Sequence, residues 1–186
     1  GEIKFLGSET ICSGSAAAQT FSTASNLILG TGSSSVINIG TGGSKNLTHA
    51  TGKTIINGTV NAKNITLDEV DAEGTINAEN ITAENFTLTE NLVIQSAAGK
   101  LVKFEGTVTG NSHNLEIKNS SAQFDSTVSG IGIAKIYDGL IKNSFTCTTL
   151  NSGHDLTIDT TGNVNCGTGS INNNLVNNGE IHCTST

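Results

Sequence analysis

Four cysteines are the residues whose type and spacing best support covalent chemistry in this sequence. Cys147, Cys166 and Cys183 are separated by 19 and 17 residues, and Cys12 stands alone near the other end. If the chain coils with a similar period, these three lie in neighbouring strands about 4.8 Å apart, a separation that a disulfide accepts. We expect either a disulfide between Cys166 and Cys183 or a column of free thiols packed as small apolar side chains. Zinc is not expected, because no Cys-x-x-Cys pair occurs.

Carboxylates are the second group able to do chemistry, and seven of them crowd one stretch: Asp68, Glu69, Asp71, Glu73, Glu79, Glu84 and Glu90. Glu105 and Asp125 each follow a phenylalanine, so we expect them to face outward on neighbouring coils. A cation such as calcium would relieve repulsion between stacked carboxylates. We prefer a solvated acidic surface, and we expect no metal and no cofactor.

No arrangement of residues typical of an active site occurs. The four histidines are scattered, and the pair His154-Asp155 follows Gly153 in an expected turn. The Gly-x-Ser-x-Gly nucleophile motif is missing. Parallel β-helices include polysaccharide lyases and hydrolases, which place acids in a long groove. This chain has no arginine and no long insertion to build such a groove. We therefore expect a protein that is not an enzyme, and keep a carbohydrate-active β-helix enzyme as the alternative.

Thr-x-Thr pairs recur in the second half of the chain. They occur at Thr87/Thr89, Thr107/Thr109 and Thr146/Thr148, with Thr127/Ser129 between the last two. A flat array of such pairs binds ice in some β-solenoids, so an ice-binding solenoid is a minor alternative. Threonine is also common on the outer positions of ordinary strands.

The elements that must position these residues are short strands joined by tight turns. The chain contains 26 Thr, 22 Asn and 22 Gly, with 13% charged and 4% aromatic residues. Threonine favours strands, whereas Gly and Asn tolerate the backbone of tight turns. So few large apolar side chains predict a thin core repeated along an axis instead of one thick core.

Two periods define the expected coil. Apolar residues recur about every five positions at Ile55, Val60, Ile65, Val70, Ile76, Ile81, Phe86 and Leu92. Such intervals place one inward residue on each short strand, followed by a corner. Phe86, Phe104, Phe124 and Phe145 are separated by 18, 20 and 21 residues, which predicts a coil of about 20 residues with a ladder of these rings inside.

We therefore expect an all-β fold, a right-handed parallel β-helix with three or four short faces per coil. The right hand follows from the preference of parallel crossovers. We expect residues 1–186 to form a single β-solenoid, a fragment of a longer rod. Residues 1–50 would be less regular coils or a cap, because their repeat is weaker, and residues 51–186 would be regular coils.

The repeats resemble those of a known class of bacterial surface protein. The heptapeptide that begins at Phe104 and ends at Gly110 matches the one from Phe124 to Gly130, and both are similar to repeats of filamentous-haemagglutinin-like and autotransporter adhesins. The segment 152–164 is similar to their repeat units as well. This resemblance implies a secreted or surface-displayed rod that mediates attachment to a host-cell or matrix glycan or protein, or to itself. It transfers no functional residue.

Charge and hydropathy exclude other partners. The net charge is −7 and no arginine is present, so binding to nucleic acid is not expected. No apolar run reaches the roughly 20 residues of a membrane-spanning helix, so this segment is not expected to insert into a membrane. A polymerising β-helix structural protein is a further minor alternative, because the octapeptide from Gly74 to Ile81 is similar to repeats of bactofilins.

Overall fold

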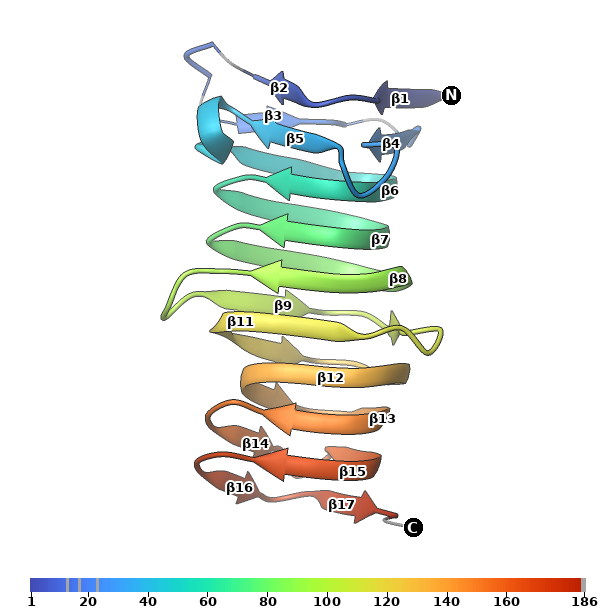
Figure 1. Cartoon of the computed structure of the whole chain (residues 1–186), viewed down its shortest axis with the longest axis vertical. Helices are drawn as coiled ribbons and strands as arrows, with labels where there is room; N and C mark the ends of the chain where they lie inside the picture. Colours follow the sequence, from blue (N-terminus) through green and yellow to red (C-terminus); the bar gives the residue numbers. More distant parts are fainter. Residues whose placement is uncertain (13, 17, 23, 185–186) are drawn as a thin grey trace.

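In the computed structural model, the strands form one parallel sheet that winds into a rod (Figure 1). The structure describes residues 1–12, 14–16, 18–22 and 24–184. This part contains no α-helix, and the 3-10 helix η1 spans Thr41–Gly43. The strands are β1 (Glu2–Phe5), β2 (Glu9–Ile11), β3 (Ala18–Thr20), β4 (Asn26–Leu29), β5 (Val36–Ile39), β6 (Asn46–Asn61), β7 (Asn64–Asn77), β8 (Asn80–Gln95), β9 (Leu101–Phe104), β10 (Val108–Thr109), β11 (Leu115–Phe124), β12 (Val128–Ile141), β13 (Ser144–Ser152), β14 (Leu156–Ile158), β15 (Asn163–Ile171), β16 (Leu175–Asn177) and β17 (Glu180–Cys183).

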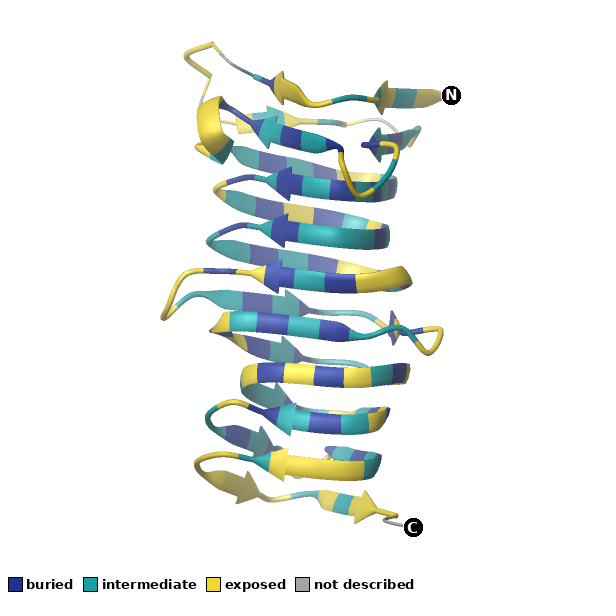
Figure 2. Cartoon of the chain, in the orientation of Figure 1, coloured by how far each residue is buried: buried dark blue, intermediate teal, exposed yellow. Residues whose placement is uncertain are grey.

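Each regular coil consists of three short extended runs, as β7 illustrates. Its runs Asn64–Leu67, Glu69–Ala72 and Gly74–Asn77 pair in parallel with successive runs of β8. We call such runs the first, second and third side of a coil. Apolar residues alternate with polar ones along each run, so one set faces the interior and the other faces solvent (Figure 2). The interval of about five residues is one run plus its corner.

The hand and the mean length of the coil agree with the prediction. Strands nearer the viewer in Figure 1 run from right to left as the chain descends, so the coils are right-handed. The rod has about 8 turns, with roughly 19 residues per turn. The predicted right-handed parallel β-helix is therefore confirmed. Single coils differ in length: Asn64 pairs with Asn80, but Ile81 pairs with Val102, because the loop before β9 lengthens that coil.

The four phenylalanines of the expected ladder are fully buried but do not form one column. Phe104 and Phe124 pair with each other on the first side. Phe86 and Phe145 lie on the second side, in register with valines. Successive rings are nevertheless 5.1–5.3 Å apart, because side chains from two sides meet in the narrow interior. The expected single column is thus a zigzag of rings across two sides.

Two columns of asparagine side chains stabilise the corner between the third side of one coil and the first side of the next. Asn61 Nδ2 donates to Asn38 Oδ1 at 2.8 Å, and Asn77 Nδ2 donates to Asn61 Oδ1 at 2.7 Å. A primary amide both donates and accepts, so like residues satisfy one another in a stack. The second column has separations of 2.9 and 2.8 Å and consists of Asn46, Asn64 and Asn80.

A stacked pair of glycines lets the chain turn into the third side. Gly58 and Gly74 are register partners, with φ of 128° and 88°. A Cβ on Gly74 would lie 2.4 Å from the carbonyl oxygen of Gly58. Only glycine fits this close contact and this backbone conformation.

The first 50 residues form longer coils than the rest of the rod. Glu2 pairs with Asn26, and Leu27 pairs with Thr54. These separations exceed the mean of roughly 19 residues. The extra residues lie in loops such as the one that contains η1, which explains why the sequence repeat is weak there.

The Thr-x-Thr pairs are not aligned as their spacing predicts. Thr87 pairs with Thr109, and Thr109 pairs with Ser129. Thr107 is therefore not the partner of Thr87, because the coil between them is two residues longer than the next one. The two-column array expected for ice binding does not form across these two coils.

Candidate functional site

Polar and aromatic side chains gather along the corner where the third side of one coil leads to the first side of the next. We call this edge the third–first corner. It follows the left edge of the rod in Figure 1, where the nearer strands turn to the back. Its residues come from successive coils, so side chains far apart in sequence become neighbours along the axis.

The N-terminal half of this corner holds an open hollow of about 840 Å³. Asn61, Asn77 and Gln95 line one wall, and Lys63 and Glu79 line the corner itself. These three amides end the third side in three successive coils. Asn61 and Asn77 already bond within the asparagine column, but each amide has a second N–H and a second lone pair to offer, at the spacing of the strands, about 4.8 Å. This row suits an extended polar ligand that lies along the axis.

Tyr137 marks the C-terminal half of the corner, where β12 passes from its third to its first side. The residue is 40% exposed, which is high for a large aromatic residue. One face of the ring stacks on the imidazole of His154, with centroids 5.5 Å apart and planes 14° apart. A hollow of about 300 Å³ is lined by Tyr137 together with Asn119, Lys135 and Asn172. The ring therefore borders open space on a polar surface.

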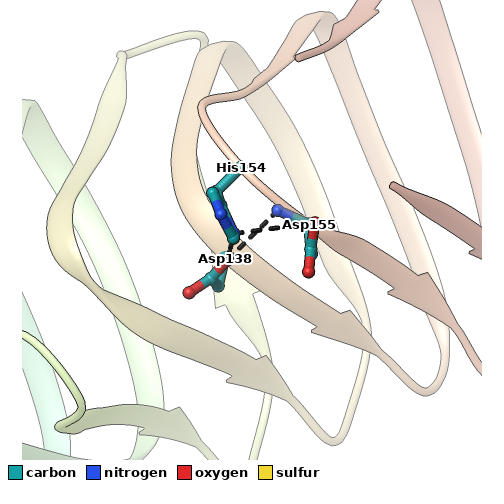
Figure 3. A group of neighbouring side chains, drawn as sticks. All are labelled: Asp138, His154 and Asp155. Carbon is teal, nitrogen blue, oxygen red and sulfur yellow. Dashed lines mark hydrogen bonds and ion pairs between the residues drawn. The ribbon is translucent and has the colours of Figure 1, made fainter. Parts of the chain in front are cut away.

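Asp138, His154 and Asp155 form a cluster beside this ring (Figure 3). Asp138 lies on β12, and the other two come from the bend between β13 and β14 in the next coil. His154 Nδ1 is 2.8 Å from Asp138 Oδ1 and 3.6 Å from Asp155 Oδ1. Asp138 Oδ1 also accepts from the Asp155 backbone N–H at 3.1 Å. All three residues are half-buried and line a hollow of about 320 Å³.

Two asparagines of the following coil complete the cluster. Asp155 Oδ1 accepts from the backbone N–H of Asn174 at 3.1 Å and from its Nδ2 at 3.2 Å. Asn173 Nδ2 lies 3.1 Å from His154 Nε2. An amide nitrogen only donates, so His154 Nε2 accepts this bond, and Nδ1 is the ring nitrogen that faces Asp138.

The chemistry open to this arrangement is binding by hydrogen bonds, aromatic stacking or metal coordination. A neutral imidazole and two carboxylates are recognised ligands of divalent ions. Among the described contacts of the His154 imidazole there is no serine or cysteine, and the Ser152 hydroxyl contacts His154 only by donating to its backbone carbonyl. The other described histidines lie elsewhere: His49 is buried with Nδ1 2.8 Å from Thr54 Oγ1, whereas His113 and His182 are near Glu90 and Glu180.

The predicted column of cysteines is confirmed on the second side of the rod. Cys147 pairs with Cys166, and Cys166 pairs with Cys183. The Sγ atoms of Cys166 and Cys183 are 2.8 Å apart, and all four cysteines are free thiols. Burial raises the pKa of the Cys147 thiol to about 12. Burial and the Cys183 thiol together raise the pKa of Cys166 to about 12. The disulfide between Cys166 and Cys183 remains a prediction.

Lysine side chains form ion pairs with several of the crowded carboxylates and offset the repulsion between them. Lys53 lies 2.7 Å from Asp71 and 3.3 Å from Glu69, and its hydrogen bond to Asp71 raises the pKa of its ammonium. Lys103 contacts Glu105 and Asp125 on neighbouring coils. A calcium ion is not needed to offset repulsion at these positions.

Sequence reasoning missed Tyr137 and Asp138 as site residues. It did place His154 and Asp155 in a turn, and the structure has a bend there. Asp138 precedes them by about one coil, so a search for acids one coil away from a histidine would have found it. Tyr137 carried a signal too, since it is the single tyrosine in a chain without tryptophan.

Comparison with protein-family models, with curated proteins and with solved structures found no match to this chain. Fold and site together define it as a right-handed parallel β-solenoid with a polar third–first corner. No helix in the described ranges is long and apolar enough to cross a membrane.

Proposed function

We propose that this chain is a segment of a bacterial surface or secreted adhesin, a non-catalytic rod that binds a glycan along its third–first corner. The observation that carries the proposal is the half-exposed ring of Tyr137, which lies beside carboxylates, an imidazole and amides. An aromatic ring offers a flat apolar face, and the polar groups around it offer hydrogen bonds. Saccharides present the complementary combination of C–H faces and hydroxyls.

The hollow in the N-terminal half of the corner supports a linear ligand. Its wall of amides repeats once per coil along the axis, through Asn61, Asn77 and Gln95. A polysaccharide also repeats along its length, so several of its units would meet equivalent groups. Weak bonds to each unit then add up over the length of the rod.

A rod that presents this surface away from its point of attachment is consistent with the resemblance to adhesin repeats. A stiff solenoid holds its corner straight and projects it from wherever the rod is attached. The partner we propose is a host-cell or matrix glycan, met outside the cell, and a host or matrix protein is the alternative that the array also tests. Self-association of rods, as in a polymerising solenoid, is the other alternative to this partner.

The test is binding of the purified chain to an array of glycans and matrix proteins. We expect binding to a subset of glycans, and about tenfold weaker binding by Tyr137→Ala, which corresponds to about 1.4 kcal/mol. Ile133→Ala is the matched control, because Ile133 is 36% exposed on the same strand but away from the corner. Loss of binding in the control alone, or no binding to any glycan, would contradict the proposal.

The same samples test the enzymatic alternative. Bound polysaccharides are incubated with the chain, and the products are separated by size. A non-catalytic rod leaves the polymer length unchanged. If shorter oligosaccharides appear and Asp138→Asn abolishes them, the protein is a carbohydrate-active enzyme and the adhesin proposal is wrong.

A further inference from the structure

His154 differs from the other described histidines in its surroundings. It lies within 4 Å of two carboxylates, Asp138 and Asp155. His113 and His182 each face one carboxylate at such a distance. The group around His154 offers a divalent cation one nitrogen ligand from the imidazole and two oxygen ligands from the negatively charged carboxylates.

The distances between these atoms are close to those of a metal site. Zinc binds imidazole nitrogen and carboxylate oxygen at about 2.0–2.2 Å, so two such ligands on a tetrahedral ion are about 3.3 Å apart. Here the Nδ1 atom is 2.8 Å from one oxygen and 3.6 Å from the other. All three ligand atoms lie within 4.8 Å of one another. An ion placed between them would replace the hydrogen bond between His154 Nδ1 and Asp138 Oδ1.

The space around the cluster allows a further ligand. The hollow of about 320 Å³ is lined by all three side chains, so coordination positions left by the protein face solvent. Asn173 is placed to support the bound form. When Nδ1 holds an ion, the ring proton moves to Nε2, and the Asn173 amide accepts it after turning its oxygen inward.

We propose that Asp138, His154 and Asp155 bind one divalent transition-metal ion, of the class to which zinc and nickel belong. Imidazole favours these ions over magnesium and calcium, which prefer oxygen ligands alone. The two carboxylates match the charge of the ion. This proposal does not depend on glycan binding, because it rests on the ligand atoms alone.

The single tyrosine makes this site directly observable. The chain has no tryptophan, so its tyrosine fluorescence comes from Tyr137 alone. The ring stacks on the proposed ligand His154. A paramagnetic ion bound there quenches this emission. The full chain is titrated with Ni²⁺, which does not oxidise the thiols, and excess Zn²⁺ is added afterwards to displace it.

We expect saturable quenching at one Ni²⁺ per chain, with recovery when Zn²⁺ replaces it. His154→Ala and Asp138→Asn each weaken binding by about tenfold or more. The control His182→Ala removes an exposed histidine 3.3 Å from Glu180 and leaves the quenching unchanged. Circular dichroism checks that each variant retains its strands. Quenching that does not saturate, that persists in His154→Ala, or that is lost in His182→Ala overturns the proposal.

Discussion

The ring of Phe104 lies parallel to the ring of Phe124, with centroids 5.1 Å apart and planes 6° apart. The two residues are register partners on the first side, so their side chains leave adjacent strands in the same direction. Phe86 and Phe145 approach this pair edge-on from the second side, at 87° and 76°. The four rings thus form the centre of the interior over four coils.

Removal of one ring from this pair should destabilise the middle of the rod. We expect Phe124→Ala to lower the free energy of unfolding by about 3–5 kcal/mol, because it leaves a cavity that the strands cannot close. Phe124→Leu should cost about 1–2 kcal/mol, because volume is largely kept and the aromatic contacts are lost. Guanidinium denaturation followed by circular dichroism measures both.

A control for this prediction is Phe5→Ala at the N-terminal end of the rod. Phe5 packs on Phe21 with centroids 6.1 Å apart and is only partly buried. Its loss should cost less than the loss of Phe124. Equal costs would mean that the stacked rings do not contribute more than a peripheral contact.

Asp125 links its coil to both neighbouring coils through ion pairs with Lys103 and Lys142, and these pairs should make stability depend on pH. Burial alone raises its pKa, but hydrogen bonds from Lys142, Gln123 and Lys103 outweigh that effect, so the pKa of the carboxyl lies below its ordinary value. A lowered pKa in the folded state stabilises the fold above the unfolded pKa of about 4. This contribution disappears as the pH falls through the folded pKa.

We therefore expect Asp125→Asn to be less stable than the wild type at pH 7 and to lose less stability below pH 4. Chemical denaturation at a series of pH values from 7 to 2 measures the difference. Glu84→Gln is the control, since Glu84 is an exposed carboxylate at the same corner, two coils before Asp125. Parallel pH curves for Asp125→Asn and the wild type would show that the ion pairs do not contribute.

The zigzag of phenylalanines also shows what spacing alone can predict. Intervals of 18, 20 and 21 residues indicated the coil and its mean length. They did not indicate on which side of the coil each phenylalanine lies, because a loop at a corner can hold extra residues while the strands remain paired. The loop before β9 does so, and Phe86 and Phe104 consequently lie on different sides.

The site was harder to predict for the same reason. Asp138 meets His154 and Asp155 only because one coil separates them and both positions fall on the third–first corner. No local sequence motif indicates that these residues are in contact. The cysteine column was predictable, since its spacings of 19 and 17 residues happen to keep all three residues on one side.

Cys166 and Cys183 should form a disulfide when an oxidant is supplied. Their Cα atoms are register partners and their Sγ atoms are 2.8 Å apart. Glutathione disulfide takes two electrons and two protons from the pair and leaves as two glutathione molecules. We expect one intramolecular bond and stabilisation of the last coil by about 3 kcal/mol, the value for a closed loop of about 15 residues.

Peptide mapping by mass spectrometry identifies the bond, and hydrogen exchange of β17 measures the stabilisation. Cys147→Ser is the control that leaves this pair intact. A bond that forms mainly between Cys147 and Cys166, or slower exchange in β17 of a Cys183→Ser variant treated in the same way, would contradict the prediction.

The column of Asn46, Asn64 and Asn80 should stabilise its corner through the middle residue. Asn64 Nδ2 donates to Asn46 at 2.9 Å, and Asn64 Oδ1 accepts from Asn80 at 2.8 Å. We expect Asn64→Ala to cost about 1–3 kcal/mol, because it removes two partly buried bonds and leaves Asn46 Oδ1 and Asn80 Nδ2 without their Asn64 partner. The matched control is Thr66→Ala, two residues further on the same outward face and exposed, where a change within about 0.5 kcal/mol is expected. Denaturation curves measure the free energy of unfolding of both variants. Equal losses would mean that the asparagine column does not stabilise the corner and reflects only the asparagine-rich composition.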